Sequence, residues 1–324
     1  MSAVLTSIGQ LQRRGPVLQI VAVVVLFLYG STTIDGFSDE QSIRSMLVIA
    51  ALLGLAAAGQ TLCVLIGALD LSVPGLILLG AVLISELYGA HGWPFLAALA
   101  FVIVVCGAAG AAVGFICHRF QVPSLIITLA VSFLALGATQ VWTDGQVTGA
   151  PPTELTDFVA ANGTTFGLSV SPIVVLWAVF AIVVGIILQK TVAGRHIFAS
   201  GANPRAAELS LVSTRRVWVT IFMVSAILSG LVGVLLAGFS GADSSIGDPY
   251  LFQGLAAVIV GGTVFMGARG DYTHTVVGAL ILTELTTILI GRGYELAEQQ
   301  IIFGLLILVV VAAYGRDRRL RDRI

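Results

Sequence analysis

The sequence predicts an all-α, polytopic membrane protein with about ten transmembrane helices. The 324-residue chain is 57% hydrophobic, and its mean hydropathy is +1.03. Only 10% of its residues are charged, against about a quarter in soluble domains. Several apolar stretches reach about 18 residues or more, which is enough to cross a bilayer as a helix. We therefore expect a single transmembrane domain over residues 1–324, with no room for a soluble domain of ordinary size.

Ten apolar segments are the expected spans. In chain order they are 16–34, 42–68, 72–91, 94–117, 123–142, 170–190, 215–240, 250–267, 272–291 and 298–315. The third is short and opens on Pro74 and Gly75, so it fits either a full span or a re-entrant, broken segment.

Basic residues orient these spans. They cluster before the first span, after the fourth, after the sixth, after the eighth and at the C-terminus: Arg13, Arg14, Arg119, Lys190, Arg195, Arg205, Arg215, Arg216, Arg269, Arg316, Arg318, Arg319, Arg321 and Arg323. Cytoplasmic loops carry the excess of Lys and Arg. All these clusters fall on one side only if an odd number of spans joins residue 40 to residue 119, and three spans there give ten in all. We expect ten spans, a short cytoplasmic N-terminus over 1–15 and a basic cytoplasmic tail over 316–324.

Ten spans can divide into five plus five, and an odd repeat unit inverts its topology. A repeated tetrapeptide, GLAA, occurs at 54–57 and 254–257. It joins two spans of equal parity, so it does not support an inverted repeat.

A charged segment over 191–214 separates the sixth and seventh spans. Asn203 can cap a helix, Pro204 fits the first helical position, and the following RAAEL favours a helix. We expect a short cytoplasmic helix here, placed to contact another protein.

Polar residues inside the apolar spans are costly unless they are satisfied or face water. The pathway candidates are Gln60, Thr61, Asp70, Ser72, Gln253, Glu284, Thr286 and Thr287. Glu284 fits a role in a pathway or an interhelix hydrogen bond as well as a structural one. Asp70, followed by Leu-Ser-Val-Pro, also fits a helix cap or a turn.

The sequence offers no catalytic machinery. It has no GxSxG, no HExxH and no GxxxxGK[ST], so the chain is not expected to bind ATP through a P-loop. Cys63, Cys106 and Cys117 lie in apolar runs and fit small buried residues. A net charge of −1 gives no reason to expect nucleic acid. We expect no enzyme activity, cofactor or metal.

Three stretches, in order and spacing, resemble the membrane permease subunits of bacterial ATP-binding-cassette (ABC) importers for monosaccharides, of the ribose/xylose/galactose type. IGALDLSVPG at 66–75 resembles that family's GGIDLSVG motif. TVAGRHIFASGANPRAAELSLV at 191–212 is similar to its T-x-x-GR-x-x-x-A-x-G-x-NPxAAxLSGI segment. The third stretch is SGLVGVLLAG at 229–238, followed by LFQGLAAVIVGGTVFMGARG at 251–270. It resembles a helix of that family followed by its ELxAIAAVVIGGTSxxGGxG motif. Leu211 and Val212 replace the usual Gly-Ile, and the polar residues of the ninth span differ, which leaves the sugar open.

The resemblance implies a subunit of the bacterial cytoplasmic (inner) membrane with several partners. These are two ABC ATPase subunits, an extracytoplasmic sugar-binding protein that meets the outer loops, a second permease copy or a related chain, and the lipid bilayer. The ATPase-coupling residues that it implies are Gly194, Arg195, Gly201, Asn203, Pro204, Arg205, Ala206, Ala207 and Glu208.

Two other functions stay open. The nearest is an ABC permease for branched-chain amino acids or nucleosides, although the Asp70-Leu71-Ser72 stretch favours sugar. The other is an ion-coupled secondary transporter that uses Glu284 as a proton or sodium site.

Overall fold

The computed structural model describes residues 16–263, 268 and 270–321, with side chains up to residue 312. The expected N-terminal segment 1–15, Arg269 and the side chains of the basic tail lie outside these described residues. Regular structure in the described part is helical, apart from an isolated β-bridge between Thr165 and Leu168. The all-α prediction is confirmed.

The helices follow the predicted apolar segments closely. They are α2 (Val17–Thr33), α3 (Glu40–Leu65), α4 (Val73–Ile84), the π-helix η1 (Ser85–Ala90), α5 (Phe95–Phe120), α6 (Ser124–Thr143), α7 (Thr153–Val159), α8 (Pro172–Lys190), α9 (Val192–Ala202), α10 (Pro204–Leu209), α11 (Thr214–Ser240), α12 (Asp248–Gly261), α13 (Tyr272–Gly291) and α14 (Leu296–Arg321).

Within the described residues, seven helical segments are long and apolar enough to cross a membrane. They are α3, α4 with η1, α5, α6, α8, α11 and α13. Val17–Thr33 and Leu296–Ala312 are shorter apolar helices. This set confirms a polytopic membrane protein.

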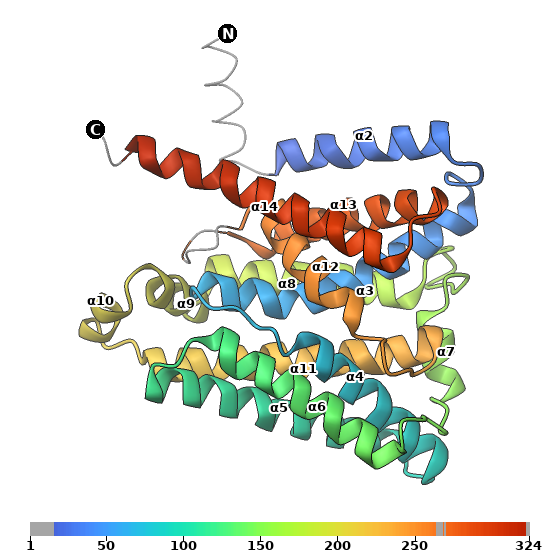
Figure 1. Cartoon of the computed structure of the whole chain (residues 1–324), viewed down its shortest axis with the longest axis horizontal. Helices are drawn as coiled ribbons and strands as arrows, with labels where there is room; N and C mark the ends of the chain where they lie inside the picture. The colour runs from blue at the N-terminus through green and yellow to red at the C-terminus, as the bar shows by residue number, and fades with distance from the viewer. Residues whose placement is uncertain (1–15, 264–267, 269, 322–324) are drawn as a thin grey trace.

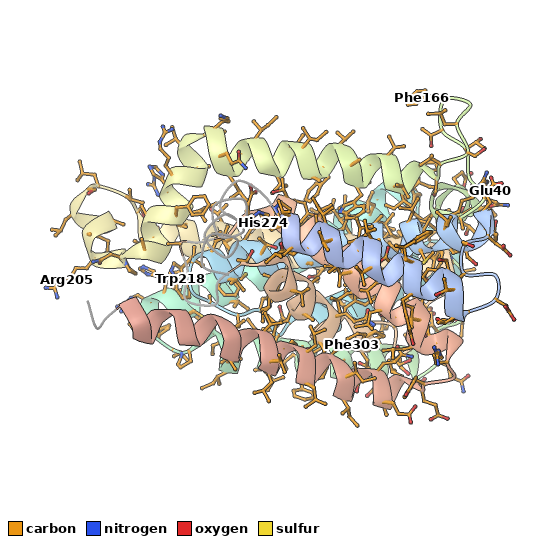
Figure 2. All side chains as sticks on the ribbon, turned by 90° about the horizontal axis from the view of Figure 1, so that it is seen from above. Glu40, Phe166, Arg205, Trp218, His274 and Phe303 are labelled. Atoms are coloured by element: carbon orange, nitrogen blue, oxygen red, sulfur yellow. The ribbon has the colours of Figure 1, made fainter. Side chains whose placement is uncertain are left out.

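The long helices run back and forth between two ends of the molecule (Figure 1). One end holds α9 and α10, together with the last turns of α3, α5, α8 and α14. The other holds α7 and the connection between α2 and α3. In Figure 2, Arg205 lies at the first end, and Glu40 and Phe166 lie at the second. We call these the α10 end and the α7 end.

The core forms where α3, α4 and α11 cross, because small residues let their backbones touch. A Cβ added at Gly80 of α4 would lie 2.1 Å from the carbonyl oxygen of Gly230 in α11. One added at Gly233 would lie 1.9 Å from the carbonyl oxygen of Ile77. The glycines in these spans therefore set the distance between two helices.

Replacing Gly80→Ala is expected to destabilise the protein by about 2 kcal/mol, because the new methyl group overlaps backbone that cannot move aside. The measurement is the thermal midpoint of the detergent-solubilised protein. Gly185→Ala in α8 is the control, since its Cβ would make an ordinary 3.7 Å contact with Thr273 Cγ2 and alanine favours a helix. Equal midpoints for the two variants would contradict the close crossing.

The contacts between helices follow an inverted pattern that the GLAA match did not reveal. α3 packs on α12 and α13, while α11 packs on α4 and α5; α4 contacts α6, as α12 contacts α14. α3 and α11 run in opposite directions, as do α4 and α12 (Figure 1). An Asp-x-Ser turn precedes each short helix: Asp70 accepts from the backbone N–H of Ser72, and Asp243 from that of Ser245.

One expectation is wrong, and the structure adds detail to two others. The eighth span was expected over 250–267, but α12 ends at Gly261, because Gly262 takes a left-handed φ of 106° and caps the helix; residues 264–267 are outside the described part. The coupling segment holds a second helix, α9, capped by Thr191. The third segment is helical over 73–90, but its last turns are a π-helix.

Candidate coupling site and pathway

The charged segment between α8 and α11 folds as two short helices joined at Asn203. Asn203 is extended, with φ −158°, and its Oδ1 accepts a hydrogen bond from the Ala206 backbone N–H at 3.1 Å. Pro204 follows in the first turn, where a missing N–H does no harm. The predicted cap and helix start are both confirmed.

Glycine lets α9 pack against the end of α3. A Cβ on Gly201 would lie 1.9 Å from the carbonyl oxygen of Leu65, the last residue of α3. The same carbonyl accepts the Ala268 backbone N–H at 2.9 Å. Gly194 is also buried, against the end of α8. The segment is therefore fixed to the ends of several long helices rather than hanging free.

The outer side of α10 is exposed and both charged and apolar. Arg205, Ala206, Glu208 and Leu209 are exposed, while Ala207 is buried against the protein. Leu211, just after the helix, is 95% exposed. Arg195 is exposed on α9. An exposed leucine pair next to charged side chains is the composition of a protein contact surface.

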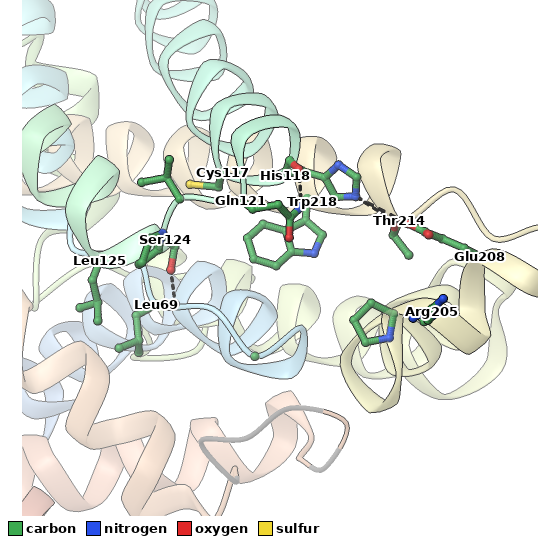
Figure 3. Close-up of a pocket in the computed structure, with 14 residues that line it drawn as sticks. Leu69, Cys117, His118, Gln121, Ser124, Leu125, Arg205, Glu208, Thr214 and Trp218 are labelled. Carbon is green, nitrogen blue, oxygen red and sulfur yellow. Dashed lines mark hydrogen bonds and ion pairs between the residues drawn. The ribbon is translucent and has the colours of Figure 1, made fainter.

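A chain of side chains links α10 to α5, which the sequence did not reveal. The hydroxyl of Thr214 donates to Glu208 Oε1 at 2.5 Å, and His118 Nε2 lies 2.9 Å from the same hydroxyl (Figure 3). Because the only Thr214 hydroxyl proton goes to Glu208, His118 must donate through Nε2–H. The chain connects the end of α5, α10 and the start of α11.

These residues border a cavity of about 930 Å³ at the α10 end (Figure 3). Its walls come from α10, the start of α11 and the α5–α6 turn, with Arg205, Gln121 and Trp218 among the lining residues. The stretch between α3 and α4 also lines it, and there Ser124 Oγ accepts the Leu69 backbone N–H at 3.0 Å. The cavity thus lies between the candidate coupling helix and the interrupted α3–α4 segment.

Asp70 holds that interruption in place. Its Oδ1 accepts the Ser72 backbone N–H at 2.9 Å and the Ser72 hydroxyl at 2.5 Å. Its Oδ2 accepts the hydroxyl of Ser225, in α11, at 2.7 Å. The turn interpretation of Asp70 is confirmed, and Ser225 is a partner that no sequence motif indicated.

The other pathway candidates are dispersed. Thr61 is buried and lies 2.8 Å, hydroxyl to hydroxyl, from Thr275. Gln60 is buried beside it in the chain, and within the described residues its Oε1 has no hydrogen-bond partner. Gln253 lies in α12 and is buried. These groups face the interior of one chain.

The candidates in α13 form a third group. Glu284 lines a cavity of about 140 Å³ among apolar side chains of α2 and α3, and its Oε2 has no hydrogen-bond partner among the described residues. Thr286 and Thr287 donate to carbonyl oxygens one turn back in their own helix, at 2.7 and 2.9 Å. The structure therefore does not bring α13 together with Asp70.

A further cavity, of about 280 Å³, lies where the two short helices begin. Pro74 and Gly75 of α4 and Gly247 and Asp248 at the start of α12 line it, together with side chains of α6 and α14. Leu71, between Asp70 and Ser72, also faces it. The segments that lead into α4 and α12 therefore meet at one cavity.

Residues 42–311 match the protein family described as "Branched-chain amino acid transport system / permease component". The chain belongs to this permease family. The ribose import permease protein of Haemophilus influenzae is 31% identical over 295 residues, covering 90% of this chain and 91% of that protein. The ribose import permease protein of Bacillus subtilis is 30% identical, covering 94% and 92%.

The D-allose transport system permease protein of Escherichia coli is also similar to this permease, at 26% identity over 92% and 90% of the two chains. No solved structure gives a significant match. The family description names amino acids, whereas these three relatives are named for sugars. The resemblance that the three sequence motifs indicated is confirmed.

Proposed function

We propose that this permease is the membrane subunit of an ATP-driven importer for a monosaccharide or related polyol. Similarity to ribose permeases over about nine-tenths of both chains carries this proposal. ATP hydrolysis resides on a separate ABC ATPase subunit, and an extracytoplasmic binding protein delivers the sugar. The branched-chain amino-acid or nucleoside alternative is not favoured, because these relatives are named for ribose and D-allose.

The proposed topology has ten passages through a bacterial inner membrane, with both termini cytoplasmic. The seven long apolar segments, α2, α14 and the short α12 supply them. The back-and-forth course of the helices supports an even number of passages (Figure 1). The exposed basic residues of the α10 end support its placement in the cytoplasm.

The segment from Gly194 to Glu208 is the proposed contact with the ATPase. Its exposed charged side chains, with the two leucines that follow, would enter a groove of that subunit, and its buried side already contacts α3 and α8. ATP-driven closure of the ATPases would then move α9 and α10 together with the long helices attached to them.

The proposed pathway runs past the cavity at the starts of α4 and α12, along a second permease copy. Five polar residues remain candidates to contact the sugar near this cavity: Gln60, Thr61, Asp70, Ser72 and Gln253. Glu284, Thr286 and Thr287 stay candidates that would need a separate branch beside α2. A sugar needs hydrogen-bonding groups along this route rather than a tight site, since the binding protein selects it.

The test is uptake into proteoliposomes that contain this permease, its co-purified ATPase and its binding protein. ATP is trapped inside, and radiolabelled D-ribose, D-allose, D-xylose and D-galactose are offered outside. We expect uptake of at least one sugar that depends on both ATP and the binding protein. Failure with all sugars, together with uptake of leucine or a nucleoside, would reassign the substrate class.

Dissipating the proton gradient with a protonophore, at constant lumenal ATP, is expected to leave the initial uptake rate unchanged. ATP closure of the ATPases needs no ion gradient, whereas a secondary transporter using Glu284 would lose its driving force. The measurement is the initial rate with and without protonophore, and ATP depletion is the matched control. A collapse of uptake with protonophore alone would favour the ion-coupled alternative.

A further inference from the structure

The α7 end of the molecule carries an acidic surface. Apart from Asp248, which lines the cavity at the start of α12, nine exposed carboxylates occur in the described connecting segments and the adjoining helices of this end: Asp35, Asp39, Glu40, Asp144, Glu154, Asp157, Asp243, Glu295 and Glu298. The described basic residues of these segments are engaged. Arg44 pairs with Glu40, and Arg292 donates to the Tyr29 hydroxyl at 2.8 Å and lies over its ring. We call these nine residues the acidic face.

The opposite end has the opposite sign. The exposed charged side chains that the structure describes there are mainly basic: Arg119, Lys190, Arg195, Arg205, Arg215 and Arg216, with Glu208. The whole chain has a formal net charge of only −1. The negative potential at the α7 end is therefore local and does not reflect an acidic protein.

One aromatic side chain projects from this end. Phe166 is 95% exposed at the tip of the connection between α7 and α8, beyond the helices (Figure 2). The backbones of Thr165 and Leu168 exchange two hydrogen bonds, of 3.0 and 2.9 Å, and the Thr165 hydroxyl donates to the Val170 carbonyl at 2.9 Å. Leu168 is itself 66% exposed. A well-bonded turn thus presents two apolar side chains to the outside.

The backbone of this turn does not favour phenylalanine. Phe166 and Gly167 both have positive φ, of 53° and 79°, as in the two-residue turns for which Asn-Gly is the preferred pair. A bulky residue with positive φ is strained, and such strain concentrates at functional positions. The local structure therefore gives no reason for an aromatic ring here, and the reason must lie in what the ring contacts.

We propose that Phe166 and the acidic face form the docking surface for the extracytoplasmic binding protein, which meets them with an apolar pocket bordered by Lys and Arg. The proposal rests on the proposed function. A fully desolvated aromatic anchor supplies most of the binding energy in many interfaces. Complementary charges around it raise the association rate and fix the orientation. The side-chain chemistry of this end thus specifies a basic partner.

The same features argue against a lipid occupant. Bacterial and other anionic lipid surfaces attract basic segments and repel acidic ones. The nine exposed carboxylates at the same end of the molecule would oppose the approach of this end to such a surface. A protein with a basic surface and an apolar pocket can contact both the Phe166 ring and the acidic face.

The first experiment tests the variant Phe166→Asn. Uptake is measured at increasing concentrations of the sugar-loaded binding protein that supports uptake by the wild-type permease, and this series gives the KM for the binding protein. Asparagine creates the preferred Asn-Gly turn, so the loop is expected to keep its shape while the ring is lost. We expect KM to rise about 30-fold, the loss typical of an aromatic anchor. Phe120→Asn is the control, since Phe120 is 63% exposed but lies at the α10 end.

The second experiment tests the charges. Glu154→Lys with Asp157→Lys on α7 is expected to raise the same KM about tenfold, and added salt should weaken wild-type docking but affect this variant less. Lys→Glu changes on the docking face of the binding protein should restore uptake with the reversed permease. Arg195→Glu at the α10 end is not a substitute control, because it lies in the proposed ATPase contact.

These outcomes separate the proposed function from the proposed docking surface. If no binding protein sustains wild-type uptake, the proposed function fails. If uptake is normal and KM stays within twofold for both Phe166→Asn and the double reversal, the docking surface is wrong while the proposed function stands. A Phe166→Asn variant with unchanged KM but weaker retention in vesicles would instead assign the ring to lipid and overturn the proposal.

Discussion

Replacing Arg205→Ala and Glu208→Ala together is expected to lower ATP-driven uptake about 100-fold while the permease still inserts in the membrane. Both side chains are exposed on α10, next to two exposed leucines; Glu208→Ala also removes the acceptor of the Thr214 hydroxyl, a single bond at the surface, so we expect the permease to fold. Truncating central charged residues in an interface typically weakens binding by about 2–4 kcal/mol. The measurements are uptake, ATPase activity and the amount of ATPase that co-purifies.

The structure divides this effect into two parts. Arg205→Ala removes an exposed side chain at the rim of the 930 Å³ cavity, so it should lower the amount of co-purified ATPase. Thr214→Val instead breaks the link from Glu208 to His118, because it removes a buried hydroxyl that bonds to both. This variant should keep the ATPase bound and still hydrolysing ATP, while uptake per ATP falls about tenfold.

Thr220→Val provides the control, since Thr220 is exposed on the same helix, about two turns further along. Wild-type uptake by the Arg205/Glu208 double variant would contradict the assignment of α10 as the coupling helix. Normal uptake per ATP in Thr214→Val would contradict a role for the His118 link to α5 in coupling. The proposed docking of the ATPase on α10 would still stand.

Replacing Asp70→Ala is expected to destabilise the protein by about 3 kcal/mol and to abolish uptake. The change removes three accepted hydrogen bonds, and it leaves the buried hydroxyl of Ser225 without this acceptor. Each buried polar group left unsatisfied costs about 1–3 kcal/mol. The stretch between α3 and α4 would then lose its attachment to α11. Thermal unfolding of the purified protein and uptake are the two measurements.

Asp243→Ala is the matched control for stability. Asp243 makes the same Asp-x-Ser turn, with hydrogen bonds of 2.7 and 2.6 Å to Ser245, but it lies at the α7 end, where Ser245 is exposed. Water can replace those bonds, so we expect a shift in stability below about 1 kcal/mol. An Asp70→Ala variant as stable as Asp243→Ala would show that Asp70 contributes only a local turn.

Much of the fold could be predicted because local chemistry determines it. The apolar runs indicated the positions of most long helices, since a bilayer requires continuous helical hydrogen bonding. Asn203 and Pro204 indicated the start of α10, since a cap and a first-turn proline act within one turn. The early end of α12 was missed because an apolar run hides the Gly261-Gly262 termination in a span rich in glycine.

The sequence by itself determined the class of protein, the positions of most of its long apolar helices and its membership in a permease family, because these depend on hydropathy, capping and short motifs. Only the tertiary structure decided which polar groups meet. It joined Asp70 to Ser225 and His118 to Thr214, across 155 and 96 residues of chain, and it kept Glu284 apart from both pairs. The charged segment between α8 and α11 was visible from the start, but its link to α5 was not. Such pairings depend on how helices cross, and no local pattern in this chain encodes them.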